Sequence, residues 1–265
     1  MNLTLLQLIK RLIMKKDQGD ILKISVSFVV MFILYHSAEY MILFKNSIGG
    51  FFIFQFLFFL SAWILGNWNQ KNGFDFWGLS FSNFKTKHVL IGIISGIILY
   101  GIPYIFSLSL GIEFLSKIPV WTDILKASIP FSFGVIFSSF SEDILTRGTV
   151  FRLFNNKIKT GWIILISSIL YLLNHIYRLN DGFDTLSYLF LLGVLFIIPL
   201  IFTKSLWITG FMHWSGNTFF FVSHNVIQTD SNMDILTPNQ IFSIWILILI
   251  PIIYYLGLKY KSRLL

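Results

Sequence analysis

Three ionisable residues lie within six positions of one another inside an apolar and aromatic stretch of the sequence. Glu142, Asp143 and Arg147 fall in the run from Ile129 to Phe154. A helix crosses a bilayer core with about 20 apolar residues, and a charged side chain at its centre costs at least about 2.5–3.5 kcal/mol. Asp143 and Arg147 are four apart, so on a helix they share a face as an ion pair. Glu142 is turned about 100° away, without a cation on its own helix, which makes it a candidate general base.

Two later apolar segments carry polar residues with helical spacing. Tyr171 and His175 are four apart, and so are His213 and Asn217. Measured along each helix from its cytoplasmic end, Glu142 lies roughly 20 Å deep, His175 roughly 22 Å, His213 roughly 12 Å and Asn217 roughly 18 Å. Residues that only join helices as hydrogen-bonding contacts need not reach a similar depth. The sequence therefore predicts one buried polar site near the middle of the membrane.

These residue types fit the hydrolysis of an amide bond. A carboxylate and a histidine can activate a water molecule, and a second histidine with an Asn amide can donate to a developing oxyanion. The sequence has no Gly-x-Ser-x-Gly elbow for a serine nucleophile and no His-Glu-x-x-His zinc motif. The spacing alone leaves open a zinc site formed by Glu142, His175 and His213.

The composition indicates an integral membrane protein. The chain has 265 residues, of which 55% are hydrophobic and 12% charged, and its mean hydropathy is +0.76. Soluble domains carry roughly 25% charged residues. The absence of cysteine excludes disulfides and thiolate metal ligands. The net charge of +8 could suggest nucleic acid as a partner, but the distribution of the charges favours membrane topology instead.

We expect an all-α, polytopic transmembrane bundle of about eight spans. Residues 1–20 are predicted to form a basic amphipathic segment on the membrane surface, and 21–265 a single transmembrane domain. His224, near the end of a predicted span, is expected at the interface. The predicted spans cover about 22–44, 49–68, 88–112, 129–154, 161–178, 185–203, 206–226 and 241–259.

Lysine and arginine predict the orientation of these spans. Four of the twenty Lys and Arg residues (Lys45, Lys117, Lys126 and Arg178) fall on one side, and Arg147 lies inside the membrane. The remaining fifteen fall on the side that holds both ends of the chain. Because positive charge collects in cytoplasmic loops, both termini are predicted to be cytoplasmic.

Three motifs on successive spans resemble one family of membrane enzymes. They resemble the CPBP family of intramembrane proteases, which includes the type II CAAX prenyl proteases and the bacterial Abi proteins. The resemblance covers roughly residues 131–221. The motifs are Glu142-Asp143-x-x-x-Arg147, Tyr171-x-x-x-His175 and His213-x-x-x-Asn217, against a family pattern of Glu-Glu-x-x-x-Arg, Phe-x-x-x-His and His-x-x-x-Asn.

The resemblance implies a role for each motif residue. Glu142 would activate the water and His175 would help to hold it, while His213 and Asn217 would form the oxyanion site. Arg147 would hold the motif helix, and Asp143 stands in for the second Glu of the family pattern. The resemblance favours a mechanism without metal or other cofactor over the zinc alternative.

The resemblance further implies an intramembrane endopeptidase that cuts a membrane-associated peptide or protein. Two alternatives remain: a non-catalytic membrane scaffold of the same family, with a role in bacteriocin immunity or surface-protein display, and a proton-coupled transporter. No inverted repeat supports the transporter. The Lys-, Ile-, Asn- and Phe-rich composition predicts a multi-pass protein of a bacterial cell membrane, with the lipid bilayer as its surroundings and no nucleic acid as a partner.

Overall fold

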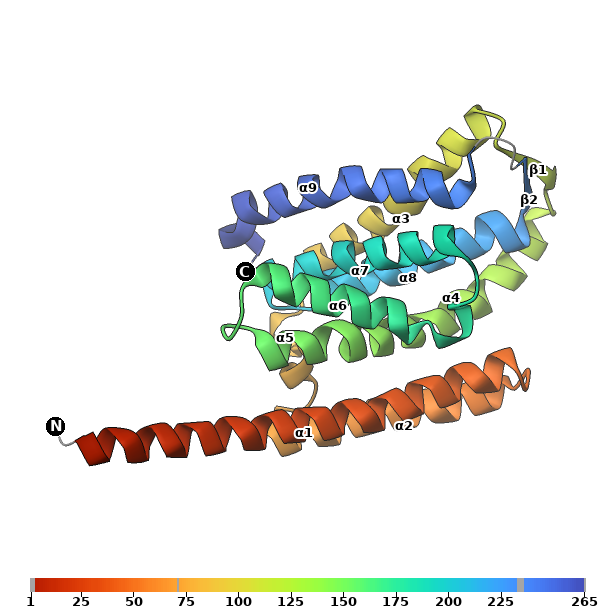
Figure 1. Cartoon of the computed structure of the whole chain (residues 1–265). Helices are drawn as coiled ribbons and strands as arrows, with labels where there is room; N and C mark the ends of the chain where they lie inside the picture. The colour runs from red at the N-terminus through yellow and green to blue at the C-terminus, as the bar shows by residue number, and fades with distance from the viewer. Residues whose placement is uncertain (1–2, 71, 233–235, 265) are drawn as a thin grey trace. The chain divides into compact units, whose positions relative to one another are not determined.

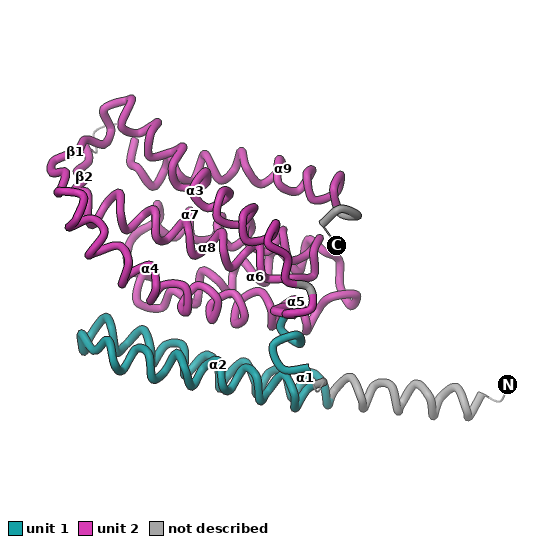
Figure 2. The backbone as a smooth tube through the Cα atoms, turned by 180° about the vertical axis from the view of Figure 1, so that it is seen from behind, with its two compact units in different colours: residues 1–77 teal, residues 78–265 magenta. Residues whose placement is uncertain are grey.

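The structure, a computed structural model, describes residues 3–70, 72–232 and 236–264 and is almost entirely helical (Figure 1). Its contacts divide the chain into two compact units, Met1–Trp77 and Gly78–Leu265, drawn in teal and magenta in Figure 2. The first unit contains α1 (Leu3–Leu43) and α2 (Ile48–Gln70). The second contains α3 (Thr86–Ser109), β1 (Glu113–Lys117), α4 (Trp121–Asp143), α5 (Thr149–Phe154), α6 (Thr160–Asn174), α7 (Phe183–Thr203), α8 (Trp207–Phe220), β2 (Gln228–Ser231) and α9 (Pro238–Leu264).

The prediction of an all-α membrane bundle is confirmed. Within the described residues, six helical stretches have the length and apolar composition to cross a bilayer. The chain is thus a multi-pass membrane protein. One of these stretches, Trp121–Phe154, joins α4 and α5 through a π-helical turn and begins eight residues before the predicted span. The others are Gly19–Leu43, Ile48–Asn69, Thr86–Ser109, Phe183–Thr203 and Pro238–Tyr260.

Two of the eight expected spans are not among these six. α6 has 15 residues, about 22 Å of helix, which is less than the roughly 30 Å of a bilayer core. It ends at Asn174 rather than at 178, because His175 leaves the helical region with φ −84° and ψ 53°. α8 has 14 residues and continues as a π-helical turn to Val226. Together they cover the predicted range of 206–226, but the α-helix itself is too short to cross a bilayer core.

The first unit is a hairpin of α1 and α2, which pack against each other. Its buried side chains include Met31, Ala38, Phe58 and Ala62, and the polar side chains of His36 and Gln55 are buried as well. The backbone of α1 is helical from Leu3 onwards. The side chains of residues 1–18 lie outside the described part of the chain, so the basic surface segment at 1–20 stays a prediction. The single transmembrane domain proposed for 21–265 stays a prediction as well.

In the second unit, α8 packs against α3 and α4, and α7 packs against α6 and α9. The core between them contains Leu99, Leu195, Phe196, Met212 and Ile246. A two-stranded antiparallel sheet pairs β1 with β2, with Glu113 opposite Ser231. The sheet therefore ties the segment that follows α3 to the segment that follows α8.

Glycine brings α3 into close contact with α8. A Cβ atom on Gly96 would lie 2.1 Å from Ser215 Oγ and 2.3 Å from the carbonyl oxygen of Met212. Gly92 lies one turn earlier and faces α8 in the same way. A Cβ atom added to it would lie 2.7 Å from the carbonyl oxygen of Ile208. Small residues spaced by four allow the backbones of membrane helices to approach closely.

We therefore expect Gly96→Val to move α8 and to reduce both stability and activity. Overpacking costs about 1–3 kcal/mol, and a shift of about 1 Å in a catalytic group can cost about 100-fold in rate. Thermal unfolding in detergent and a peptide cleavage assay would measure the two effects. Gly161→Val is the matched control, because a Cβ atom there would meet nothing within 4 Å. If both variants unfold at the same temperature and cleave at the same rate, the close contact between α3 and α8 at Gly96 does not position the site.

Candidate active site

A π-helical turn interrupts the helix that carries the acidic residues. α4 ends at Asp143, and the turn spans Ile144–Gly148. Such a turn leaves backbone carbonyls without their usual helical partners, which is costly in a membrane. The neighbouring helix compensates, because Ser167 on α6 donates to the carbonyl oxygen of Thr146 at 3.0 Å. The turn is thus held by α6, the helix that ends directly before His175.

Arg147 and Asp143 form an ion pair in which both side chains are fully buried. The guanidinium of Arg147 lies over the rings of Tyr171 on α6, 4.5 Å away, and Phe196 on α7, 4.9 Å away. Cation–π contacts of this kind are strongest when they are desolvated. Arg147 therefore connects the acidic turn to two other helices.

Asp143 has a second partner, His213 on α8. The Nδ1–H of His213 donates to Asp143 Oδ1, at 3.2 Å. The other ring nitrogen, Nε2, lies 3.6 Å from Glu142 Oε2. A carboxylate in this position orients the imidazole and stabilises its protonated form. Asp143 thus links Arg147 to the histidine whose Nε2 faces Glu142.

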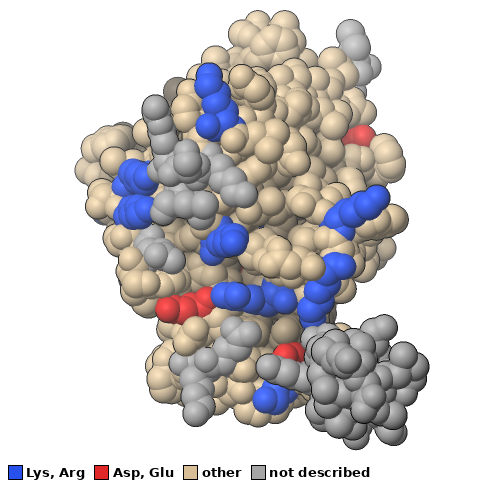
Figure 3. Space-filling model, turned by 90° about the vertical axis from the view of Figure 1, so that its left-hand side faces the viewer, with Lys and Arg blue, Asp and Glu red and all other residues tan. Residues whose placement is uncertain are grey.

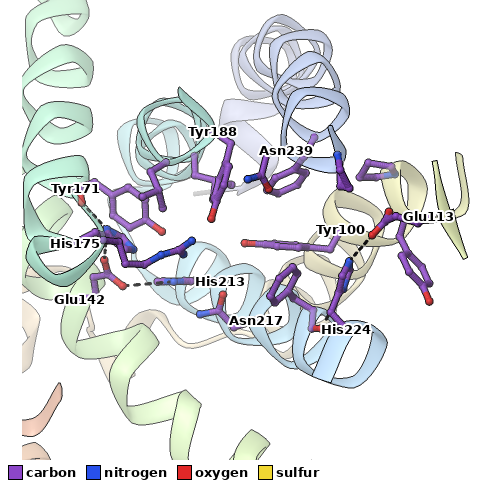
Figure 4. A pocket seen from close by; sticks show the side chains of 18 residues that line it. Tyr100, Glu113, Glu142, Tyr171, His175, Tyr188, His213, Asn217, His224 and Asn239 are labelled. Atoms are coloured by element: carbon purple, nitrogen blue, oxygen red, sulfur yellow. Dashed lines mark hydrogen bonds and ion pairs between the residues drawn. The ribbon is translucent and has the colours of Figure 1, made fainter. Parts of the chain in front are cut away.

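Glu142 lies between histidines from two different helices (Figure 4). Its Oε1 is 3.7 Å from His175 Nδ1 and its Oε2 is 3.6 Å from His213 Nε2. Both distances exceed a direct hydrogen bond, so the contacts are electrostatic. Asn174 donates from Nδ2 to Glu142 Oε1 at 3.3 Å, and Glu142 is only 5% exposed. The carboxylate therefore has an amide donor and two imidazoles around it.

The non-helical backbone at the end of α6 sets the orientation of His175. The Nδ1–H of His175 donates to the carbonyl oxygen of Tyr171, at 2.8 Å. With its proton on Nδ1, a neutral imidazole keeps Nε2 as an acceptor. His175 is thus able to accept a hydrogen bond from water while it lies beside Glu142.

These side chains line one end of a cavity of about 150 Å³, which we call the active-site cavity. Figure 4 shows Glu142, His175 and His213 together at that end, with Asn217 beside His213 on α8. The same helix thus presents His213 and Asn217 to one space, as their spacing of four requires. The remaining lining residues are Tyr100, Pro103, Tyr104, Glu113, Tyr171, Arg178, Tyr188, Leu189, Leu192, Phe220, His224, Pro238, Asn239 and Phe242.

A comparison with protein-family models matches residues 125–219 to the type II CAAX prenyl endopeptidase Rce1-like family. This part of the chain is therefore an Rce1-like domain by similarity. The match includes α4 with its π-helical turn and continues through nearly all of α8, so it spans the three segments that build the site. Comparisons with curated proteins and with solved structures found no match. Since the Rce1-like family is a family of proteases, the match supports hydrolase chemistry in general terms.

The zinc alternative can be compared with the arrangement of side chains in the structure. Among the described residues, no group of three or more His, Asp or Glu side chains is arranged to hold a metal ion. The zinc alternative would use Glu142, His175 and His213. In this structure Glu142 faces both histidines, His175 Nδ1 at 3.7 Å and His213 Nε2 at 3.6 Å.

The Rce1-like domain thus brings Glu142, His175, His213 and Asn217 to one cavity, with Asp143 and Arg147 behind them. Sequence reasoning missed the hydrogen bond from Asn174 to Glu142. The signal that could have predicted this bond is the position of Asn174, a polar residue directly before His175 in an apolar span. His224, which is expected at the interface, also lines the other end of the active-site cavity.

Proposed function

We propose that the protein is an intramembrane endopeptidase that hydrolyses a peptide bond of a membrane-associated protein or peptide. The observation that carries the proposal is the position of Glu142. Its two carboxylate oxygens each face a histidine from another helix, at 3.7 and 3.6 Å, in a cavity large enough for several water molecules.

In the first step, Glu142 takes a proton from a water molecule whose oxygen attacks the carbonyl carbon of the substrate. His175 accepts a hydrogen bond from the same water through Nε2 and holds it in line. The carbonyl oxygen becomes an oxyanion that receives hydrogen bonds from the side chains of His213 and Asn217. His213 donates from Nε2 as an imidazolium, which Asp143 stabilises from the opposite side of the ring.

In the second step, the C–N bond breaks and protonated Glu142 returns its proton to the leaving nitrogen. The products are a carboxylic acid and an amine, and no covalent enzyme intermediate forms. Arg147 takes no part in proton transfer and acts through Asp143, which it holds in place.

We expect Asn217→Ala to lower kcat by about 100- to 1,000-fold with little change in KM, because one oxyanion donor is lost. Initial rates of peptide cleavage would measure the effect. Asn225→Ala is the matched control, since Asn225 is exposed on the helical extension of α8. If Asn217→Ala cleaves as fast as Asn225→Ala, Asn217 is no oxyanion donor.

A direct test would incubate purified wild-type protein and the Glu142→Ala variant with a set of membrane-associated peptides, in the presence of a chelator. Mass spectrometry would then identify products that only the wild type forms. Differential products support a metal-independent endopeptidase. Products that form only when the chelator is left out would favour the zinc alternative. A wild type that forms none in either condition, in spite of a folded helical spectrum, would favour the non-catalytic scaffold.

We further propose that the protein resides in a bacterial cell membrane with both termini in the cytoplasm. The proposal is supported by the composition and by the fifteen Lys and Arg residues on one side of the predicted spans.

A further inference from the structure

The active-site cavity has a buried end and an exposed end. Glu142 and His213 at the first end are only 5% and 2% exposed. At the other end, the side chain of Arg178 is 45% exposed and Phe220 is 47% exposed. We call the exposed end, lined by Arg178, Phe220, His224 and Asn239, the mouth of the cavity. A substrate would reach Glu142 from there.

The mouth lies at one defined end of the second unit. Arg178 ends the 3₁₀ turn that comes after α6, His224 lies in the π-helical turn after α8, and Asn239 is in the first turn of α9. β1 and β2 lie at this same end in Figure 1. Glu113, the first residue of β1, accepts a hydrogen bond from His224 Nε2 at 3.0 Å, and both residues line the cavity (Figure 4).

The opposite end of the second unit carries a cluster of basic residues, which we call the Lys-rich end. It includes the starts of α3, α6 and α8 and the ends of α5, α7 and α9. Figure 3 shows Lys and Arg gathered on this face of the molecule. The basic residues of the second unit there whose side chains the structure describes are Lys85, Lys87, Arg152, Lys157, Lys159, Lys204 and Lys259.

Acidic residues are distributed in the opposite way. Among the described residues of the second unit, no Asp or Glu lies at the Lys-rich end. The mouth end has three basic residues, Lys117, Lys126 and Arg178. Its acidic residues are Glu113, Asp123, Asp181, Asp184 and Asp230.

From these two observations we propose that the active-site cavity opens to the non-cytoplasmic side of the membrane. Short loops rich in Lys and Arg remain in the cytoplasm, which assigns the Lys-rich end to that side. The mouth, at the other end of the same bundle, then faces outwards. Given the proposed peptidase function, on which this inference depends, the substrate class is an exported peptide or the outer segment of a membrane protein.

The absence of cysteine from the chain makes a direct test possible. Single variants Asn239→Cys at the mouth and Lys157→Cys at the Lys-rich end would be treated with a charged, membrane-impermeant maleimide, first in intact protoplasts and then in inverted vesicles. We expect Asn239→Cys to react in protoplasts and Lys157→Cys to react only in inverted vesicles. Asp181→Cys, on the exposed loop after Arg178, provides a second reporter if Asn239→Cys does not fold.

The opposite labelling pattern would overturn the proposal. So would a mouth cysteine that reacts from neither side while Lys157→Cys does react, since the mouth would then be closed to water. Labelling does not depend on catalysis, so its outcome stands even if the protein is no peptidase. If cleavage is observed, the maleimide should block it in Asn239→Cys protoplasts but not in the cysteine-free parent.

Discussion

Glu142→Gln is expected to lower kcat by about 100- to 10,000-fold, the range that a positioned general base contributes. Glutamine has nearly the same shape, and its amide oxygen can still accept the hydrogen bond from Asn174, but it cannot take a proton from water. KM should change little, because the side chain acts on the water rather than on substrate binding. Single-turnover cleavage of a peptide identified by mass spectrometry would give the rate.

Asp123→Asn is the matched control for this loss, because it makes the same carboxyl-to-amide change on the same helix at an exposed position. It should cleave at the wild-type rate. Both variants should unfold at the wild-type temperature in detergent, which separates catalysis from folding. A Glu142→Gln protein that cleaves as fast as Asp123→Asn would show that Glu142 is not the base. A biological phenotype that is unaffected by Glu142→Gln would favour the non-catalytic membrane scaffold.

Arg147→Met is expected to have the largest effect on stability, about 3–5 kcal/mol of unfolding free energy. The variant removes the cation from a fully buried pair and leaves Asp143 with His213 as its hydrogen-bonding partner. Methionine keeps much of the apolar contact with the rings of Tyr171 and Phe196, so the loss reports mainly on the charge. Denaturant titration in detergent would measure it.

Lys157→Met controls for the same substitution at an exposed site, where we expect a change within about 0.5 kcal/mol. The double variant Asp143→Asn with Arg147→Met should recover part of the lost stability, because no uncompensated charge is then buried. If Arg147→Met is as stable as Lys157→Met, the ion pair does not hold this turn together.

Spacing within single helices was enough to predict much of the site. Asp143 and Arg147, and likewise His213 and Asn217, are four apart, so one helix turn brings each pair to a common face. The depths of Glu142 and the histidines followed from the helix rise alone. These inferences need only local geometry, which the sequence carries directly.

Contacts between helices could not be predicted in the same way. The bond from Asn174 to Glu142 joins residues 32 apart, and the bond from His213 to Asp143 joins residues 70 apart. The π-helical turn after Asp143 and the non-helical backbone of His175 have no periodic signal in the sequence either. The end of α6 was accordingly placed too late in the sequence.

The short length of α6 couples the site to the surrounding lipid. A 15-residue helix, about 22 Å long, is roughly 8 Å shorter than an average hydrocarbon core, and the segment from His175 to Gly182 that follows it contains only one 3₁₀ turn. Irregular backbone is tolerated at that depth only against protein or water. Lipids with longer acyl chains would increase this hydrophobic mismatch, so the turnover rate of the protein should depend on bilayer thickness.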